Sequence, residues 1–247
     1  MAHMSRLYDV GFNEPVVDES ILANGVRVRL RLLGTHDKAA LSRGFERLSP
    51  ESRYRRFLTP KKHLTADELR FFTELDGVNH LAVAALELSD DGREGDIVGV
   101  ARCIRIHGET DVAEVAIAVI DELQSLGLGR LLLERLACVA SARGINHFRF
   151  YFLSDNNQIR GLVKRLCWNV KLSSDGQLIA AECPISGPDA VQDDTLELLD
   201  LVAKGSVIAK GSVVVATPLA LSFISADIWW REIKRTLTLK TIPTRDD

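Results

Sequence analysis

A short turn that contains two glycines carries the residues best suited to bind an anion. It reads Gln124-Ser125-Leu126-Gly127-Leu128-Gly129-Arg130, and it joins a run of β-branched and small apolar residues to a helical pattern. Small residues in such a turn let successive backbone N–H groups face one anion, and the positive end of a helix dipole follows directly. The pattern favours a diphosphate site with Arg130 adding positive charge, although an ordinary strand-to-helix turn can have the same composition.

Two common phosphate-binding motifs are excluded at this turn. A Walker A loop requires Lys-Ser/Thr after its last glycine, and Arg130-Leu131 follows Gly129 here. A dinucleotide-binding fingerprint requires a third glycine at the position that Leu132 occupies. The pattern that remains is Gln-x-x-Gly-x-Gly.

The strand before the turn adds a carboxylate that is suited to proton transfer. Glu114 is the single charged residue in this apolar run, and its face continues with Ala116 and Ala118. These small side chains leave room for a ligand that lies along the strand. Burial disfavours a charged carboxylate, so we expect a raised pKa and the ability to take a proton from an attacking amine. The alternative is a structural ion pair of Glu114 with Arg102 or Arg105.

Alternating strand and helix patterns surround this stretch and predict an α/β fold. The predicted strands cover residues 26–32, 80–88, 97–106, 111–120 and 147–153, and a hairpin joins 170–172 to 178–182. The predicted helices cover residues 38–48, 49–57, 65–75 and 128–143, with one more that begins after Asn156. This order indicates a mixed, mostly antiparallel, twisted sheet flanked by helices.

Composition divides the chain into three parts. Residues 1–23 form an N-terminal arm whose first four residues resemble a cloning scar, and residues 24–188 form the domain. Residues 189–247 form a C-terminal helical extension, which contains an uncharged run at 211–226. This run is too short for a membrane span. Packing on the domain or on a second copy in a homodimer is favoured, and a membrane-surface role is disfavoured.

Charge and cysteine content narrow the class of protein. The formal net charge of −3 gives no electrostatic reason to expect nucleic acid as a partner. The four cysteines are widely spaced and form no C-x-x-C pair, which indicates small core residues rather than a metal site. Cysteines of this kind fit the reducing cytoplasm.

Several blocks in order resemble the GCN5-related N-acetyltransferases (GNAT). They include Gln124-x-x-Gly127-x-Gly129 after a buried strand and Asp155-Asn156 after the next strand. The segments Glu51–Phe57, Asp76–His80 and Ala113–Ala116, together with Arg165, resemble more specifically the acetyltransferase domain of bacterial Pat-type protein-lysine acetyltransferases. The resemblance covers residues 24–188 and implies a GNAT fold.

The resemblance also implies roles for individual residues, with acetyl-CoA as the acyl donor and no metal. Backbone groups of Ile117, Ala118 and Val119 would hold the pantetheine arm. The turn would bind the pyrophosphate through Gln124, Ser125, Leu126, Gly127, Leu128, Gly129 and Arg130. Asn156 would contact the pantetheine portion, Arg165 would reach the phosphates, and His80 would line the acceptor channel. Glu114 matches the general base of a direct transfer that needs no covalent enzyme intermediate.

Three departures from the family pattern affect this expectation. Ser125-Leu126 replaces the usual Gly-Arg, which removes one cation and stiffens the turn. Val163 stands where many relatives place a tyrosine that acts as general acid, and Pat-like enzymes share this departure. Cys167-Trp168 replaces the common Gly-Phe. The sequence therefore predicts an N-acetyltransferase for a protein lysine, with a small-molecule amine acetyltransferase and a non-catalytic acyl-CoA sensor as alternatives.

Overall fold

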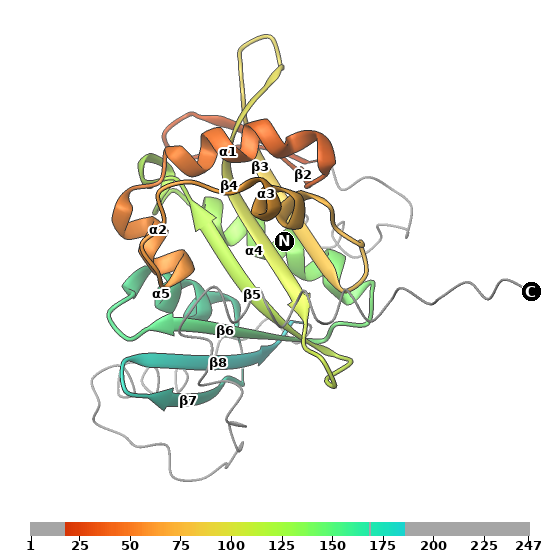
Figure 1. Cartoon of the computed structure of the whole chain (residues 1–247), viewed down its shortest axis with the longest axis vertical. Coiled ribbons are helices and arrows are strands. Elements are labelled where there is room, and N and C mark those ends of the chain that lie inside the picture. The colour runs from red at the N-terminus through yellow and green to blue at the C-terminus, as the bar shows by residue number, and fades with distance from the viewer. Residues whose placement is uncertain (1–17, 168, 186–247) are drawn as a thin grey trace, which may run out of the picture.

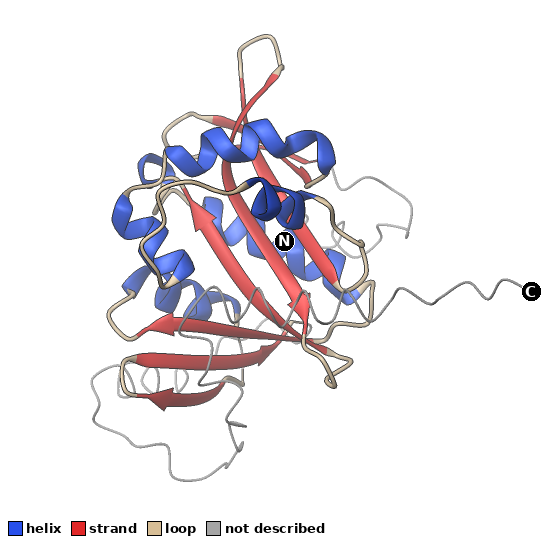
Figure 2. Cartoon of the chain, viewed as in Figure 1, coloured by secondary structure: helices blue, strands red, loops and turns tan. Residues whose placement is uncertain are grey.

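The computed structural model describes residues 18–167 and 169–185, which form one twisted sheet with helices on both faces (Figures 1 and 2). The predicted extension at 189–247 and most of the predicted N-terminal arm lie outside the described residues. The eight strands, in their order across the sheet, are β1 (Asp18–Ile21), β2 (Arg27–Leu32), β3 (His80–Leu88), β4 (Glu94–Arg105), β5 (Val112–Val119), β6 (His147–Leu153), β8 (Leu178–Pro184) and β7 (Lys171–Asp175). The predicted fold class is confirmed.

The helices follow the same order as the sequence patterns. They are η1 (Thr35–Asp37), α1 (Lys38–Glu46), α2 (Pro50–Phe57), α3 (Ala66–Thr73), η2 (Asp121–Leu123), α4 (Leu128–Ser141) and α5 (Asn157–Leu166). Polar side chains begin three of them: Ser49 accepts from the N–H of Ser52, Thr65 forms a capping box with Glu68, and Asn156 caps α5. In Figure 2, α1, α2 and α3 lie on the near face of the sheet, and α4 lies behind it.

The sheet begins earlier than the sequence patterns predict. Asp18–Ile21 pairs antiparallel with β2, although these residues fall in the expected N-terminal arm. Every second residue of this four-residue strand is exposed, so it lacks the apolar alternation that identifies longer strands. Its place at the sheet edge explains why so short and polar a segment forms a strand.

Buried side chains on both faces hold the helices to the sheet. The inward face of α4 carries a stripe of fully or nearly fully buried residues, namely Leu128, Leu132, Leu133, Leu136 and Val139. On the opposite face, Leu41 and Phe72 pack with residues of β3 and β4 in a second apolar cluster. Burial of this kind is worth about 1.5–3 kcal/mol for each large apolar side chain.

One exchange of partners divides the sheet. All neighbouring strands are antiparallel except β5 and β6, which pair in parallel from Val112–Val115 to His147–Phe150. Beyond Val115, β5 continues beside β4 as far as Val119, whereas β6 continues beside β8. The two strands therefore diverge in a V, which Figure 1 shows at the ends of β5 and β6.

The expectation that all four cysteines are separate core residues is wrong for two of them. Cys167, just after α5, and Cys183 in β8 form a disulfide with their Cα atoms 5.5 Å apart. The 16-residue separation gives no sign of this contact, which arises because β8 returns beside β6. Cys103 is buried and free, and Cys138 is free on α4. The expectation of a cytoplasmic location assumes that the cysteines are free thiols. Only Cys103 and Cys138 are free, so only these two cysteines agree with that assumption.

Among residues 18–167 and 169–185, no helix is both long and apolar enough to cross a bilayer.

Candidate active site

The divergence of β5 and β6 opens a cavity of about 490 Å³ at the centre of the molecule. Its walls come from α2, the end of β5, the turn before α4, the end of β6 and the first turns of α5. The sequence-predicted residues that line it are Glu114, Ile117, Ala118, Val119, Gln124, Ser125, Gly127, Gly129, Arg130, Asn156 and Arg165. Residues that are up to 51 positions apart along the chain thus meet at one cavity.

The β5 wall offers backbone groups to a ligand. The register between β5 and β6 ends at Val115, so the edge of β5 from Ala116 to Val119 has no strand partner on that side among the described residues. An extended ligand arm can add to such an edge as a strand does. The carbonyl of Val119 is already engaged, because the side chain of Gln124 donates a 3.0 Å hydrogen bond to it.

Gln124 connects three walls of the cavity. Its Nε2 donates to Val119 O at 3.0 Å and to Ser52 Oγ at 3.2 Å. Its Oε1 accepts from Gln158 Nε2 at 2.6 Å, which ties the turn to α5. The side-chain amide of a glutamine, which donates and accepts at once, suits this position. The side chain therefore shapes the mouth of the cavity by bonding to protein rather than by facing its interior.

The glycines bring the start of α4 close to the cavity. Gly127 has a φ of 91° and precedes the first residue of α4, a conformation that favours glycine. At Gly129 a Cβ atom would come within 3.1 Å of the Leu162 side chain and 3.6 Å of Ile117. A larger residue at Gly129 would therefore separate α4 from α5 or project into the cavity. Gly127 is favoured by its backbone conformation, and Gly129 by the limited space beside Leu162.

Ser125 and Leu126 account for the irregular part of the turn. Ser125 has a φ of 62°, in the left-handed region where glycine is preferred. Leu126 packs against the main hydrophobic core and does not line the cavity. Leu128 is fully buried at the start of α4 and does not line it either. For these two leucines, only the backbone remains available for the predicted role.

Arginines lie at the rim where phosphates would sit. Arg130 lines the cavity and pairs with Glu134 at 2.6 Å while remaining 56% exposed. Arg165, on the last turn of α5, is exposed and forms no ion pair with the described residues. A free guanidinium beside a glycine turn and a helix N-terminus fits a diphosphate group. The cavity thus has the shape and charge for a long phosphorylated ligand.

Asn156 caps α5 and also lines the cavity. It is 9% exposed, and its Oδ1 accepts from the N–H of Ile159 at 3.3 Å to begin α5. No described residue accepts a hydrogen bond from its Nδ2, although the residue lines the cavity. The amide can therefore donate to a ligand without disturbing the helix cap.

Glu114 lies where the two strands separate, and its carboxylate forms no ion pair with any residue that the structure describes. The alternative of an ion pair with Arg102 or Arg105 is excluded, because those guanidinium groups bond to His80, to Asn79 and to backbone carbonyls. Burial raises the pKa of Glu114 to about 7, although the cations of Arg56 and Arg149 act to lower it. A carboxylate with this pKa can accept a proton near neutral pH.

Arg56 is the nearby charge that sequence analysis does not identify as part of the site. It lines the cavity from α2 and interacts electrostatically with Glu114. Burial lowers the pKa of Arg56 to about 10, so it remains a cation at neutral pH. Three arginines stand together at residues 53, 55 and 56, and a helical pattern alone does not show which one faces inward. Arg53 instead bonds to backbone carbonyls, and Arg55 bonds to Glu51.

His80 lies away from this cavity, at the start of β3. Its Nε2 is 2.9 Å from Arg102 Nη1, and its ring packs against Phe71 with centroids 4.8 Å apart. Burial, followed by the charge of Arg102, lowers the pKa of His80 to about 3. The imidazole is therefore neutral near pH 7 and accepts the hydrogen bond from Arg102. Its role in an acceptor channel stays a prediction.

Position 163 offers no tyrosine as a general acid, and a different tyrosine lines the cavity. Val163 is fully buried in α5 and carries no titratable group. Tyr151 of β6 lines the cavity instead, and burial raises its pKa. The phenol is thus protonated at neutral pH. This second polar group facing Glu114 is not apparent from the sequence, because β6 reads as an ordinary aromatic strand.

Comparison with known proteins identifies the family. Residues 45–167 match the model of the acetyltransferase (GNAT) family. Acetyltransferase Pat of Mycolicibacterium smegmatis is 30% identical over 154 residues, which is 62% of this chain and 44% of Pat. Acetyltransferase PA5475 of Pseudomonas aeruginosa is 30% identical over 143 residues, which is 57% of this chain and 74% of that protein. This chain therefore spans less than half of Pat.

A solved structure extends the likeness to three dimensions. The GNAT domain of S. lividans PAT superposes with a TM-score of 0.61 at 30% identity. The superposition covers 68% of this chain and 96% of that domain. The resemblance to Pat-type acetyltransferases predicted from the sequence is confirmed.

Proposed function

This chain is an acyltransferase of the GNAT family, and we propose that it transfers an acetyl group from acetyl-CoA to a primary amine with Glu114 as general base. The observation that carries the proposal is the position of Glu114, a carboxylate with a pKa of about 7 and no ion-pair partner among the described residues, where β5 and β6 separate. The same cavity contains an open strand edge and a glycine turn with arginines, which suit a pantetheine arm and a pyrophosphate. The proposed reaction assigns no step to a metal, and no cluster of three or more metal-binding side chains occurs among the described residues.

The donor would extend along the edge of β5. Ile117, Ala118 and Val119 offer backbone groups to the pantetheine arm, and Asn156 lines the same cavity. The turn from Gln124 to Arg130 would hold the pyrophosphate, with Arg165 adding charge from α5. This orientation brings the thioester toward the apex of the V, where Glu114 lies.

Transfer would proceed in one displacement. Glu114 takes the proton of the acceptor ammonium group, and the free amine attacks the thioester carbonyl carbon. The new C–N bond forms as the C–S bond breaks, and the thiolate of CoA leaves with the electron pair. Near neutral pH the carboxylate is partly ionised, which is the condition under which a general base is most effective. Arg56 would favour that ionised form through its charge.

The preferred acceptor is the ε-amino group of a protein lysine. The resemblance to Pat-type enzymes supports this choice, and so does Val163 at the position where many small-amine acetyltransferases carry a tyrosine. A small-molecule amine is the second candidate, since the cavity itself does not depend on the size of the acceptor. A non-catalytic acyl-CoA sensor is the third, and the unpaired Glu114 disfavours it.

Glu114→Gln tests the catalytic proposal. The amide keeps the shape of the side chain but cannot accept the proton, so we expect at least a 100-fold loss of turnover at pH 7 with acetyl-CoA affinity retained. Turnover would be measured by thiol release and affinity by calorimetry. Unchanged turnover would exclude Glu114 as the base, and absent acetyl-CoA binding in the unmodified chain would overturn the proposed function.

A lysate experiment identifies the acceptor class. The chain is incubated with isotopically labelled acetyl-CoA and a bacterial lysate, and the Glu114→Gln variant serves as the matched control. Label on lysine side chains in proteins, absent from the control, is the expected result. Label confined to small molecules would replace the protein-lysine proposal with the small-amine alternative.

A further inference from the structure

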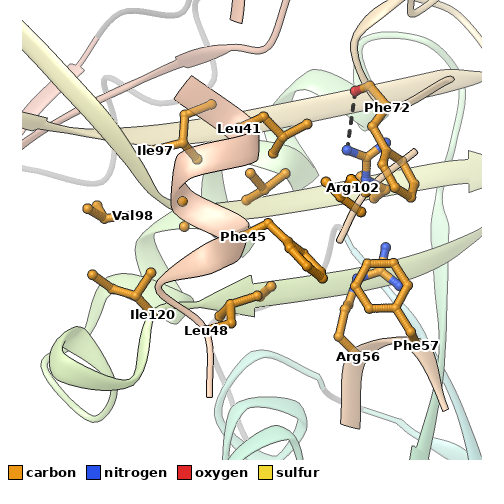
Figure 3. Close-up of a pocket in the computed structure, with 15 residues that line it drawn as sticks. Leu41, Phe45, Leu48, Arg56, Phe57, Phe72, Ile97, Val98, Arg102 and Ile120 are labelled. Atoms are coloured by element: carbon orange, nitrogen blue, oxygen red, sulfur yellow. Dashed lines mark hydrogen bonds between the residues drawn. The ribbon is translucent and has the colours of Figure 1, made fainter. Parts of the chain in front are cut away.

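A second, smaller cavity lies under α1 beside the cleft between β5 and β6 (Figure 3). It has a volume of about 60 Å³, and most of its wall is apolar, with Leu41, Phe45 and Val98 among the lining residues. Leu48, Arg56 and Ala118 line both this cavity and the larger one. The two cavities therefore share a wall along the part of β5 that is proposed to hold the pantetheine arm, and Arg56 in this wall also interacts electrostatically with Glu114.

Two arginines stand at one side of the small cavity, as Figure 3 shows. Arg102 is 4% exposed, and its guanidinium carbon lies 4.5 Å from the centroid of the Phe72 ring. It bonds to two uncharged groups, His80 Nε2 at 2.9 Å and the Phe72 carbonyl at 3.3 Å. The guanidinium carbon of Arg56 lies 4.8 Å from the centroid of the Phe57 ring, and Arg56 makes no hydrogen bond to a described residue.

Neither arginine forms an ion pair with a described residue, although Glu114 acts on the charge of Arg56 from a greater distance. No carboxylate of the described residues lies within 4.0 Å of either guanidinium. The charge of Arg56 also disfavours the charged form of Arg102 and acts with burial to lower the pKa of Arg102. Buried charges in proteins are normally paired, because removing a charge from water is costly. Two like charges at one cavity wall therefore indicate that a bound anion supplies the missing partner.

We propose that the small cavity is an acyl-chain pocket for CoA thioesters whose acyl group ends in a carboxylate, with the succinyl group as the fitting size. This proposal rests on the proposed acyltransfer function. A dry cavity of about 150 Å³ can hold the six carbons of benzene, so about 60 Å³ has room for two or three carbon atoms. An acetyl group would leave the pocket unfilled. A succinyl group would fill this volume with its two methylenes and place its carboxylate outside it, against the guanidinium groups, where Arg56 lines both cavities.

The reaction keeps the same balance with this donor. The acceptor amine gives its proton to Glu114 and forms a C–N bond to the thioester carbon, while the C–S bond breaks and CoA leaves as the thiolate. The terminal carboxylate is not altered. It would serve only to bind, through charge-assisted hydrogen bonds to the two guanidinium groups.

Calorimetry with three donors separates charge from chain length. Acetyl-, butyryl- and succinyl-CoA are titrated into the full chain, where butyryl has the same carbon count as succinyl but no charge. We expect succinyl-CoA to bind at least tenfold more tightly than butyryl-CoA, because hydrogen bonds to buried charged groups are strong. Equal affinities, or weaker binding of succinyl-CoA, would overturn the proposal.

Arg102→Met tests the source of that preference. We expect the variant to lose the succinyl-over-butyryl difference, while Arg43→Met, which removes an exposed arginine from α1, keeps it. A preserved difference in Arg102→Met would contradict the arginine-pair assignment. Thermal unfolding of each variant checks that the fold is intact.

Leu41→Phe tests the pocket without removing a charge. The larger ring would fill the space under α1, so binding of butyryl- and succinyl-CoA should weaken at least fivefold, with acetyl-CoA affinity changed less than twofold. If Leu41→Phe weakens the binding of all three donors equally, the longer acyl chains do not occupy the small cavity, and the proposal is wrong. Since binding needs no acceptor, these results separate the pocket from the proposed function: loss of acetyl-CoA binding in the unmodified chain defeats both, whereas acetyl-CoA binding without a succinyl preference defeats only the pocket.

Discussion

Two groups of charged residues in this molecule are arranged in opposite ways. The edge cluster consists of Glu19, Arg29, Arg31, Asp37 and Glu94, near the outer strands β1 and β2 and the start of β4. The cleft cluster consists of Arg56, Arg102 and Glu114, between α2 and the strands β4 and β5. In the edge cluster every arginine has a carboxylate partner, whereas in the cleft cluster no ion pair forms among the described residues.

The pKa shifts follow this difference. At the edge, burial acts to raise the pKa of Asp37, but hydrogen bonds from Arg31 and from the N–H of Gly34 outweigh it and lower the pKa overall. Hydrogen bonding to Arg31 likewise lowers the pKa of Glu94. In the cleft, burial dominates, so the pKa of Glu114 rises to about 7 and that of Arg102 falls to about 9. Each cleft group is therefore driven toward its neutral form.

The two clusters thus serve different ends. Charges at the edge are paired in the folded state and favour folding. Charges in the cleft have no ion-pair partner among the described residues and are available to bind or react with a ligand. Perturbed pKa values without protein partners are typical of sites that bind or react. The comparison predicts that changes at the edge alter stability and leave catalysis intact, whereas changes in the cleft alter catalysis or binding and affect stability mainly through its pH dependence.

Asp37→Ala should have the largest effect on stability. Asp37 has a 3% exposed side chain and receives hydrogen bonds of 2.9 and 2.7 Å from Arg31 and 2.8 Å from the N–H of Gly34. Removing one partner of such a buried pair costs about 3–5 kcal/mol. Denaturant unfolding should show that loss, while the KM for acetyl-CoA stays unchanged. Glu19→Gln is the matched control in the same cluster, and its half-exposed pairs predict a loss below about 1 kcal/mol.

The pH dependence of stability should also differ between the clusters. The lowered pKa of Asp37 stabilises the fold above its unfolded pKa of 3.8, and this contribution is lost as the pH falls through the folded value. The raised pKa of Glu114 acts in the opposite sense: its contribution is complete below 4.5 and is lost as the pH rises through about 7. Glu114→Gln should therefore flatten the decline in stability between pH 4.5 and 7, as measured by unfolding at several pH values. An unchanged decline would show that Glu114 is not desolvated.

Arg56→Gln should change catalysis by an intermediate amount. Arg56 acts to lower the pKa of Glu114, so its removal should raise that pKa and move the acidic limb of kcat/KM to higher pH. For a shift of about one unit, the rate at pH 7 falls several-fold and recovers at higher pH. Arg55→Gln is the matched control from the same helix, because Arg55 pairs with Glu51. It should leave the limb in place. A pH-independent loss in Arg56→Gln would assign Arg56 to donor binding instead.

Local patterns were sufficient to predict most of the fold. Strands β3 and β6 have the predicted limits, and the caps at Thr65 and Asn156 form as expected, because alternation and capping are properties of neighbouring residues. The strand β1 is missed because it is short and polar. The disulfide of Cys167 and Cys183 is missed because it depends on how β8 returns to β6.

The residues of the candidate site also fall into those that the local sequence predicts and those that it does not. Glu114, the two glycines and Asn156 line one cavity, and each belongs to a local motif that the sequence displays. Arg56 and Tyr151 also line it, yet nothing in their immediate neighbours distinguishes them from an exposed arginine or an ordinary strand residue. Their place follows from the divergence of β5 and β6, which is a property of the whole sheet. Long-range geometry therefore sets the electrostatics of the site, while local sequence supplies its chemical groups.

Ser125→Gly should produce the smallest effect and shows whether the cleft carries backbone strain as well as unpaired charge. Ser125 has a φ of 62°, a conformation that costs a residue with a side chain roughly 1–2 kcal/mol. Glycine would remove this cost, but part of the gain is offset because glycine has more freedom in the unfolded chain. A net stabilisation of about 0.5–1 kcal/mol is expected in denaturant unfolding. Ser125→Ala is the control, since it removes the hydroxyl but keeps the strain, and it should give no gain. Because the turn already has the shape that glycine prefers, acetyl-CoA affinity should change less than threefold; a larger gain in affinity without added stability would mean that the turn must rearrange to bind its ligand.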